Sequence, residues 1–240
     1  MKLVILDGLD NSGKTWTIKE LKKRCQESGI HCETVHFPSK ELCETEIFKK
    51  MCKKENKHDY EIKMEFVREV VAEETAILTR LKKEGCGLVL IDRFLLSTLI
   101  YQGDGMEYEW VTEKGIINEY TLMFDLLDIR PRDIAHFVFI PKIQDDTKET
   151  NETKLKFDKM YDELKTKLLS LLDNIRKNSS GYIRYGALFG DYLKNIVVFD
   201  EDVFQENRPL TRRELDILTE NRVLKMMEFI NHKEICYEKN

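Results

Sequence analysis

The sequence predicts an α/β fold, a doubly wound five-stranded parallel sheet with helices on both faces. The first observation behind this prediction is that short apolar runs alternate along the chain with longer stretches of helical periodicity. The second is that the runs at residues 3–6 and 88–91 are continuously apolar, which is typical of parallel strands buried on both faces. Such sheets bind ligands at the carboxyl ends of their strands.

The expected elements can be placed in order along the chain. Strands are expected at residues 3–6, 32–37, 88–91, 136–140 and 196–199. Helices are expected at residues 14–27, 40–54, 60–83, 110–127 and 155–176. A last helix is expected to begin at Thr211, because Thr211 and Glu214 have the spacing of a capping box.

Composition limits the classes of protein that fit. The chain has 240 residues, of which 42% are hydrophobic, and this predicts a single domain spanning residues 1–240. The net charge of -5 does not favour a nucleic-acid partner. No apolar run approaches the roughly 20 residues of a membrane span, and no signal peptide precedes the first strand. Six cysteines without a CxxC pair indicate reduced thiols, so a cytoplasmic protein is expected.

Residues 8–15 read GLDNSGKT and match GxxxxGK[ST], the P-loop. A short apolar run precedes them and a helical stretch follows, so the glycine-rich turn is expected to direct backbone N–H groups and a helix N-terminus at one anion. Lys14 is expected to reach the β- and γ-phosphates of ATP, and Thr15 to ligate Mg²⁺. The residues expected to line the triphosphate site are Gly8, Asn11, Ser12, Gly13, Lys14, Thr15 and Trp16.

A second nucleotide-binding motif is matched by the residue types, but the residues before it differ from those of that motif. Residues 56–59, NKHD, match the NKxD signature that reads guanine in GTPases. That signature follows a late buried strand, whereas residues 52–55 here are CKKE. We therefore interpret residues 56–59 as a polar loop.

Asp92 and Arg93 stand at the end of the strand expected at residues 88–91. A carboxylate and a guanidinium facing a P-loop suit phosphoryl transfer, because Arg offers a planar fork to a phosphate. A structural ion pair at a sheet edge is the alternative interpretation.

Residues 92–103 read DRFLLSTLIYQG, and this stretch resembles the thymidylate kinase family, in which DR is followed by a Ser and then by YQG. The P-loop, with Asp7 in place of Glu, and the Phe37-Pro38 pair after the second strand are similar to that family as well. The resemblance is specific in the first ~105 residues of the chain and faint afterwards.

The resemblance implies ATP-dependent phosphorylation of a deoxynucleoside monophosphate, usually dTMP, by a homodimer. The apolar stripe of residues 60–83 also favours a dimer. By resemblance, Asp10 helps to position Mg²⁺ or the acceptor sugar, and Asp92 assists Arg93 in gripping the acceptor phosphate. The acceptor is expected to meet Phe37, Pro38, Lys40, Phe66, Arg68, Arg93, Ser97, Thr98, Tyr101 and Gln102.

The chain departs from the family in its basic residues. Some members carry an Arg at the position of Asn11, and others carry arginines in a lid that closes over ATP. Here a lid is expected near residues 142–160, where Lys159 takes the place of the family's lid arginine.

Base recognition is expected to differ too. In the family an aromatic residue stacks on thymine, and four residues later an Arg binds the base. With Phe66 as the aromatic residue, that position holds Val70, and Arg68 points about 200° away from Phe66 on a helix. Glu73 and Glu74 follow, and a carboxylate favours the amino groups of cytosine or guanine. We expect dTMP to be accepted with relaxed or altered discrimination at the base. Another deoxynucleotide or a modified pyrimidine as acceptor, and a nucleotide-binding module without catalysis, are the alternatives.

Overall fold

The structure is a computed structural model that describes residues 1–8, 12–53, 56, 59–102, 115–139, 166, 196–199, 204–205, 208–209 and 211–231. For residues 99–101, 198, 204–205 and 208–209 it describes the backbone alone.

A five-stranded parallel sheet forms the centre of the fold, as predicted. Its strands lie in the order β2-β3-β1-β4-β5. Every neighbouring pair in this sheet is parallel. The strand bounds are β1 Lys2–Gly8, β2 Glu33–His36, β3 Leu88–Asp92, β4 Ile134–Phe139 and β5 Ile196–Phe199. Two short strands, β6 Phe204–Gln205 and β7 Arg208–Pro209, form a separate antiparallel pair.

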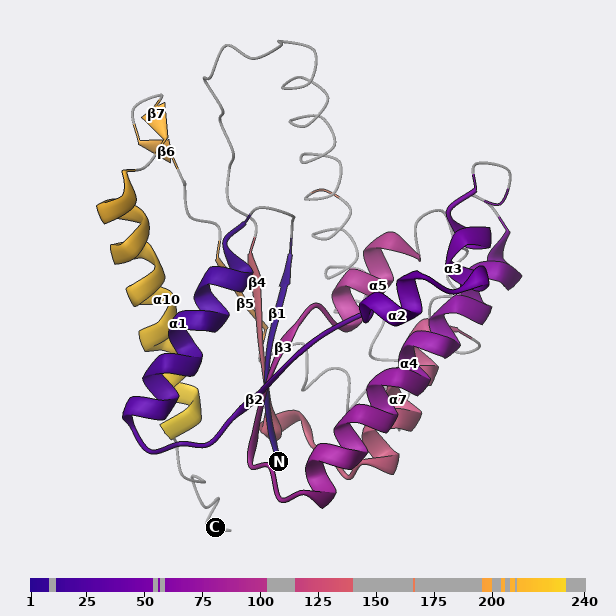
Figure 1. The fold of residues 1–240 in the computed structure, drawn as a ribbon, viewed down its shortest axis with the longest axis horizontal. Helices are drawn as coiled ribbons and strands as arrows, with labels where there is room; N and C mark the ends of the chain where they lie inside the picture. The colour runs from indigo at the N-terminus through magenta and orange to yellow at the C-terminus, as the bar shows by residue number, and fades with distance from the viewer. Residues whose placement is uncertain are drawn as a thin grey trace, which may run out of the picture.

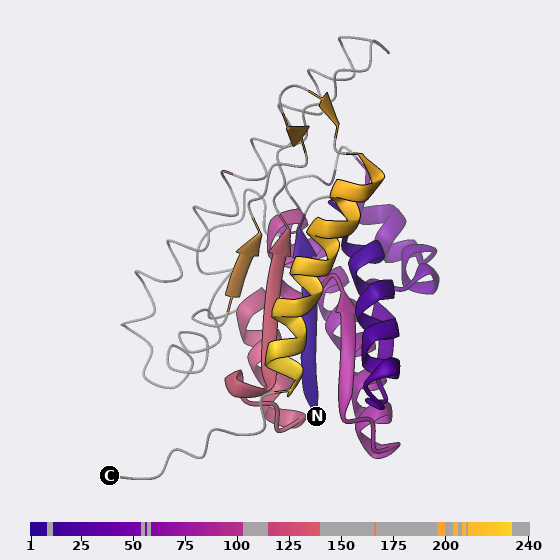
Figure 2. The same cartoon turned by 90° about the vertical axis from the view of Figure 1, so that its left-hand side faces the viewer.

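Helices cover both faces of the sheet, so the fold has three layers (Figures 1 and 2). Helices α1 (Lys14–Glu27) and α10 (Arg212–Asn231) lie on one face, and α4 (Tyr60–Lys83), α5 (Leu95–Tyr101) and α7 (Ile116–Leu126) lie on the other. Two short helices, α2 (Lys40–Cys43) and α3 (Glu46–Met51), extend beside α4, and a 3-10 turn, η2 (Pro131–Asp133), precedes β4.

The alternation of side chains along β1 explains the two cores. Leu3 and Ile5 pack with α4 and α7, whereas Val4 and Leu6 pack with α1 and α10. All four side chains are fully buried. A strand that is apolar at every position can fill both interfaces, which is why its sequence does not alternate.

Several predicted bounds differ from the structure. The helix expected at residues 40–54 is two helices, because the hydroxyl of Thr45 accepts a hydrogen bond from the Phe48 N–H and starts α3 anew. The second strand is shorter than expected, and the fourth begins two residues earlier. In the region expected to be helical at 110–127, α7 begins at Ile116, and residues 110–114 lie outside the described part. The helix expected at 155–176 lies outside it as well, except for residue 166.

The capping box predicted at Thr211 is confirmed. The Thr211 N–H donates to Glu214 Oε2 at 2.7 Å, and the Glu214 N–H returns a bond to Thr211 Oγ1 at 3.4 Å, which is the capping box. Asp59, the last residue of the NKHD stretch, caps α4 by accepting a hydrogen bond from the Ile62 N–H at 3.1 Å.

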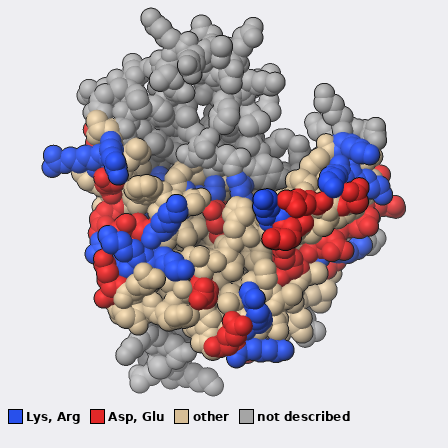
Figure 3. Space-filling view, in the orientation of Figure 1, with Lys and Arg blue, Asp and Glu red and all other residues tan. Residues whose placement is uncertain are grey.

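None of the described helices combines the length and apolarity that crossing a membrane requires. On the face drawn in Figure 3, Lys and Arg side chains lie among Asp and Glu side chains.

Asp7, near the end of β1, is a buried carboxylate with partners on two other elements. Its Oδ2 lies 2.9 Å from His136 Nε2 of β4. Its Oδ1 accepts bonds from the Phe94 N–H at 3.0 Å and from the hydroxyl of Ser97. Burial raises the pKa of the Asp7 carboxyl, but the contact with His136 and these hydrogen bonds outweigh burial and hold the pKa below its ordinary value of 3.8.

We expect Asp7→Asn to lower the free energy of unfolding by about 3 kcal/mol at pH 7, because it breaks a buried charged contact. Since the pKa of Asp7 is lowered in the folded state, its contribution is complete above the ordinary value of 3.8 and is lost as the pH falls through the folded pKa. The difference in free energy of unfolding between wild type and variant, measured by urea unfolding, should therefore stay constant from pH 7 down to the ordinary value of 3.8 and narrow only below it. Asp128→Asn, which removes an exposed partner of Arg130, is the control and should change little. A difference that stays constant as the pH falls below 3.8 would contradict this account of Asp7.

Candidate active site

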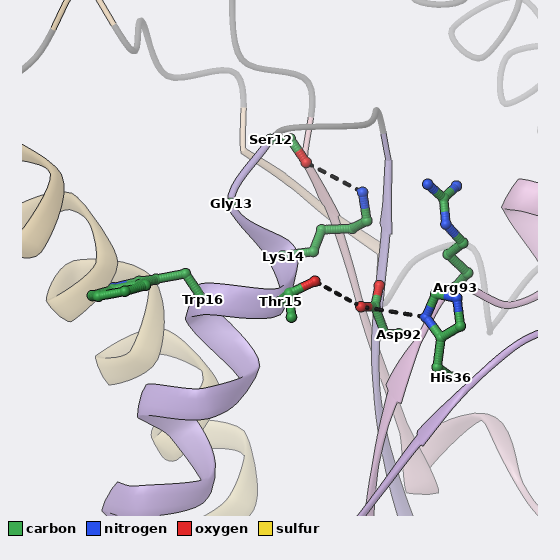
Figure 4. Close-up of a pocket in the computed structure, with 8 residues that line it drawn as sticks. All are labelled: Ser12, Gly13, Lys14, Thr15, Trp16, His36, Asp92 and Arg93. Carbon is green, nitrogen blue, oxygen red and sulfur yellow. Dashed lines mark hydrogen bonds and ion pairs between the residues drawn. The ribbon is translucent and has the colours of Figure 1, made fainter.

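The P-loop leads from the end of β1 into α1, and its described residues form one wall of a pocket. We call this the P-loop pocket; its volume is about 400 Å³, and it is lined by Ser12, Gly13, Lys14, Thr15, Trp16, His36, Asp92 and Arg93 (Figure 4). Lys14 Nζ donates to Gly8 O at 3.0 Å and to Ser12 Oγ at 3.4 Å, which holds the amine over the turn. The indole of Trp16 points away from Lys14 and is 52% exposed.

Gly8 shows why the first position of the motif has no side chain. Its φ is +126°, and a Cβ there would lie 2.2 Å from Phe139 O on β4. The turn therefore starts where two backbones are in close contact, and a larger residue would push β1 away from β4.

Asp92, the last residue of β3, faces the start of α1. Its Oδ2 accepts a hydrogen bond from Thr15 Oγ1 at 3.1 Å and lies 3.5 Å from His36 Nδ1. Burial by itself raises the pKa of the Asp92 carboxyl, but His36, the charge of Lys14 and the bond from Thr15 together lower the pKa below its ordinary value. Asp92 is therefore a carboxylate at neutral pH, and its buried Oδ1 has no hydrogen-bond partner among the described residues.

Arg93 follows directly and has an uncommon backbone. Its φ is +71°, in the left-handed region that favours glycine, and its N–H donates to Leu6 O at 3.0 Å. A strained residue of this kind persists where its surroundings hold it, and such residues gather at functional sites. Figure 4 shows its guanidinium on the same side of the strand ends as the Lys14 amine.

A second pocket adjoins the first. We call it the aromatic pocket; its volume is about 480 Å³. It lies between the carboxyl end of the sheet and helices α2 to α5, and its lining residues are His36, Phe37, Pro38, Cys43, Phe48, Met51, Cys52, Phe66, Val70, Glu74, Arg93, Phe94, Ser97, Thr98 and Gln102. His36 and Arg93 line both pockets, so the two cavities meet at these side chains.

Helix α4 presents Phe66, Val70 and Glu74 to the aromatic pocket, one residue per turn. The Phe66 ring packs on Phe48 of α3 with 5.5 Å between centroids. Glu74 is fully buried, and its Oε1 accepts a hydrogen bond from the Tyr120 hydroxyl at 3.1 Å. Tyr120 Oη in turn lies 3.0 Å from Thr98 Oγ1.

The structure brings most of the predicted substrate residues to this pocket. Phe37, Pro38, Phe66, Arg93, Ser97, Thr98 and Gln102 all line it. The Ser97 hydroxyl also donates a hydrogen bond to the buried Asp7, so Ser97 stabilises the fold as well as lining the pocket. Asp10, Asn11 and Lys159 lie outside the described residues, as does the lid expected at 142–160, and of Tyr101 only the backbone is described.

Two predicted residues lie elsewhere. Arg68 lines neither pocket; its Nε is paired with Glu119 Oε1 of α7 at 3.2 Å, on the outer side of α4. The spacing of two from Phe66 explains this, because the two side chains leave the helix in opposite directions. Lys40 is exposed at the start of α2 and lines neither pocket. Glu73 accepts from the Ser39 N–H at 3.0 Å, beside Pro38, and so supports the start of α2.

Several residues of the site were not predicted from sequence, among them His36, Val70 and Arg222. His36 could have been found, because it ends a strand beside Phe37. Val70 could also have been assigned to the wall from its spacing to Phe66. Arg222 of α10 gave no signal, because it is more than two hundred residues from the P-loop in sequence. Its Nη1 donates to Ser12 O at 3.3 Å, and its guanidinium stacks on Phe139 at 4.7 Å.

Comparisons with known proteins agree with this fold. The fold is similar to the crystal structure of thymidylate kinase from Ehrlichia chaffeensis, with a TM-score of 0.52 and 14% sequence identity over 94% of this chain and 98% of that chain. At that identity the likeness concerns the fold. A comparison with curated proteins gives no match. The model of the family described as thymidylate kinase matches residues 6–178.

A P-loop at the carboxyl end of the central strand of a parallel sheet, with a second pocket across Arg93, is the arrangement of a nucleoside monophosphate kinase. The family match covers more than half of the chain. The chain therefore belongs to the thymidylate kinase family.

We expect Arg222→Met to weaken the binding of a nucleoside triphosphate about tenfold, because a charged hydrogen bond that holds the P-loop backbone is lost. Lys225→Met is the matched control. Lys225 lies on the same helix and packs its amine on Phe199 at 5.2 Å, as Arg222 also packs on that ring at 5.8 Å. Dissociation constants from isothermal titration calorimetry compare the two variants. Equal affinities in both would show that Arg222 is needed for packing alone.

Proposed function

We propose that this protein transfers the γ-phosphoryl group of ATP to dTMP and forms dTDP. One observation carries the proposal: the P-loop pocket and the aromatic pocket meet at His36 and Arg93. Phosphoryl transfer needs a donor and an acceptor placed in line, with positive charge at the group that moves. Two adjoining cavities with a guanidinium at their junction meet that need.

The donor side is the P-loop pocket. The N-terminus of α1 and the turn before it offer backbone N–H groups to phosphate oxygens, and the helix dipole adds to the attraction. Lys14 is held over the turn by its bonds to Gly8 O and Ser12 Oγ. Its amine can exchange these partners for phosphate oxygens without a large movement of the chain.

The residues beside the P-loop fit Mg²⁺, which the family generally uses. The Thr15 hydroxyl and the ionised Asp92 carboxylate lie 3.1 Å apart, and Asp92 Oδ1 has no hydrogen-bond partner among the described residues. Hard oxygen ligands in small number suit Mg²⁺, which takes its other ligands from phosphates and water. When bound, the ion supplies charge neutralisation at the β- and γ-phosphates. Thr15 is the predicted ligand, and Asp92 holds its hydroxyl in place.

The acceptor side is the aromatic pocket. Arg93 offers two parallel N–H donors to the phosphate of the monophosphate, which fixes its orientation as well as its charge. Phe66 and Val70 give the base an apolar wall, and Thr98 stands at the buried end. His36 lies beside the same junction, where its ring contacts Asp92. A group passing from donor to acceptor would thus move between Lys14 and Arg93.

Two further proposals concern the whole chain. We propose a single domain with a lid near residues 142–160 that excludes water from the donor phosphates. We also propose a homodimer in which α7 contributes to the interface, because Leu122 and Leu126 of α7 are 51% and 73% exposed. The apolar stripe of α4 does not support this interface, because Ile62, Phe66, Val70 and Leu81 are buried within the chain. Light scattering at micromolar concentration should give the mass of two chains, and the mass of one chain would refute the dimer.

A coupled assay for ADP release tests the reaction. Release should depend on both ATP and dTMP, and Lys14→Met should abolish it while circular dichroism shows an intact fold. Lys19→Met, on the same helix, is the control and should keep the wild-type rate. If ADP release does not respond to dTMP or to any other deoxynucleoside monophosphate, the chain binds nucleotides without this catalysis.

Arg93→Lys tests the junction of the two pockets. A point charge does not replace a planar fork, so we expect kcat/KM for dTMP to fall at least tenfold. The melting temperature separates this role from a structural one. Normal kinetics per folded molecule with a lowered melting temperature would mean that Arg93 supports the fold and does not grip the acceptor.

A further inference from the structure

The buried end of the aromatic pocket contains a carboxyl group that the transfer of phosphate does not use. Glu74 lies on α4 one turn beyond Val70, and none of its side chain is exposed to solvent. Its Oε1 accepts from the Tyr120 hydroxyl, but its Oε2 has no hydrogen-bond partner among the described residues. A buried oxygen without a hydrogen-bond partner lowers stability unless a ligand forms a hydrogen bond with it. The position of Glu74 on the pocket wall indicates where that ligand lies.

The surroundings of Glu74 favour the neutral carboxyl. Burial raises the pKa of Glu74 well above its ordinary range, and the carboxylates of Asp7 on β1 and Glu73 on α4 raise it further. The bond from Tyr120 opposes this shift without reversing it. Burial also raises the pKa of Tyr120, so its hydroxyl keeps its proton.

The direction of the hydrogen bonds fixes where the proton of Glu74 lies. Tyr120 has one hydroxyl hydrogen and donates it to Glu74 Oε1, so in its 3.0 Å contact with Thr98 Oγ1 the tyrosine oxygen is the acceptor. The single hydroxyl hydrogen of Thr98 also faces Phe94 O at 3.4 Å and is shared between the two acceptors. In a neutral carboxyl group the oxygen that accepts is the carbonyl oxygen. With the Tyr120 hydrogen on Oε1, the proton of a neutral Glu74 is on Oε2, the oxygen without a hydrogen-bond partner among the described residues, so a group that reaches Oε2 from the pocket meets a donor.

We propose that Glu74 determines base specificity by donating a hydrogen bond from Oε2 to the C4 carbonyl of the acceptor's pyrimidine, an inference that rests on the proposed transfer to a deoxynucleoside monophosphate. Phe66, Val70 and Glu74 occupy successive turns of one face of α4, so a ring packed along the first two directs an edge toward the third. The edge opposite the sugar-bearing N1 carries the C4 substituent. Thymine and uracil have a carbonyl there, whereas cytosine has an amino group, which donates and does not accept.

This assignment reverses the preference expected from sequence. An ionised Glu73 or Glu74 would favour the amino group of cytosine, but Glu73 is engaged by the Ser39 N–H outside the pocket. The neutral Glu74 instead fits the base that the family usually phosphorylates. A carboxylic acid thus stands in this pocket, one turn past the Val70 that occupies the position of the family's Arg.

The test compares dUMP with dCMP, two acceptors that differ only at C4 and in the proton on N3. Four proteins are measured: wild type, Glu74→Gln, Glu74→Met and, as the control, Glu73→Gln. Glutamine keeps a carbonyl oxygen for Tyr120 and an N–H donor for the base, whereas methionine keeps the volume without either. The readouts are the ratio of kcat/KM for dUMP to that for dCMP, and the ratio of their dissociation constants by calorimetry.

We expect wild type, Glu74→Gln and Glu73→Gln to favour dUMP by similar ratios, within about threefold of one another. In Glu74→Met the ratio should fall at least tenfold, mainly through loss of activity with dUMP. A wild-type preference for dCMP would overturn the proposal, as would a Glu74→Met ratio equal to that of wild type, or Glu74→Gln behaving as Glu74→Met does. If the protein binds both nucleotides and phosphorylates neither, the proposed reaction fails, and the ratio of dissociation constants still decides the role of Glu74.

Discussion

The carboxylate of Asp7 is the contact on which the rest of the site depends. It is fully enclosed at the end of the central strand, where it meets His136 of the neighbouring strand and the first residues of α5. An enclosed charge needs partners on every side, because desolvation costs more than any single contact returns. The first turn of α5 therefore has a fixed position relative to β1. Since Arg93 precedes that turn and Thr98 lies within it, Asp7 places both ends of the aromatic pocket without touching a substrate.

The sequence was sufficient to predict the sheet and most of the donor site. Continuous apolar runs located the strands, and the P-loop motif located the turn after β1, because both signals are local. Bounds that depend on a single hydroxyl, such as the break at Thr45, could not be predicted from periodicity. Arg222 could not be predicted at all, since its contact with Ser12 depends on how α10 packs against α1.

The acceptor side shows a different limit of sequence reasoning. Helical spacing was enough to predict that Phe66 and Arg68 lie on different sides of α4. In the structure Phe66 lines the aromatic pocket and Arg68 pairs with Glu119. The same spacing could not assign a protonation state to Glu74. Burial and the charge of Asp7, which both depend on contacts between distant parts of the chain, raise the pKa of Glu74. The chemistry that a carboxyl group offers thus depends on the fold around it as well as on residue type.

The contact between Arg222 and the P-loop has a consequence for the order in which the protein becomes functional. The ribosome synthesises β1 and the P-loop before α10, and Ser12 and Arg222 are 210 residues apart in sequence. Until then the carbonyl of Ser12 lacks its guanidinium, and the face of the sheet formed by Val4 and Leu6 lacks Val223 and Met226. The P-loop is therefore completed by a segment that is synthesised long after it, so a nascent chain that has not yet reached α10 carries the motif without the contact from Arg222.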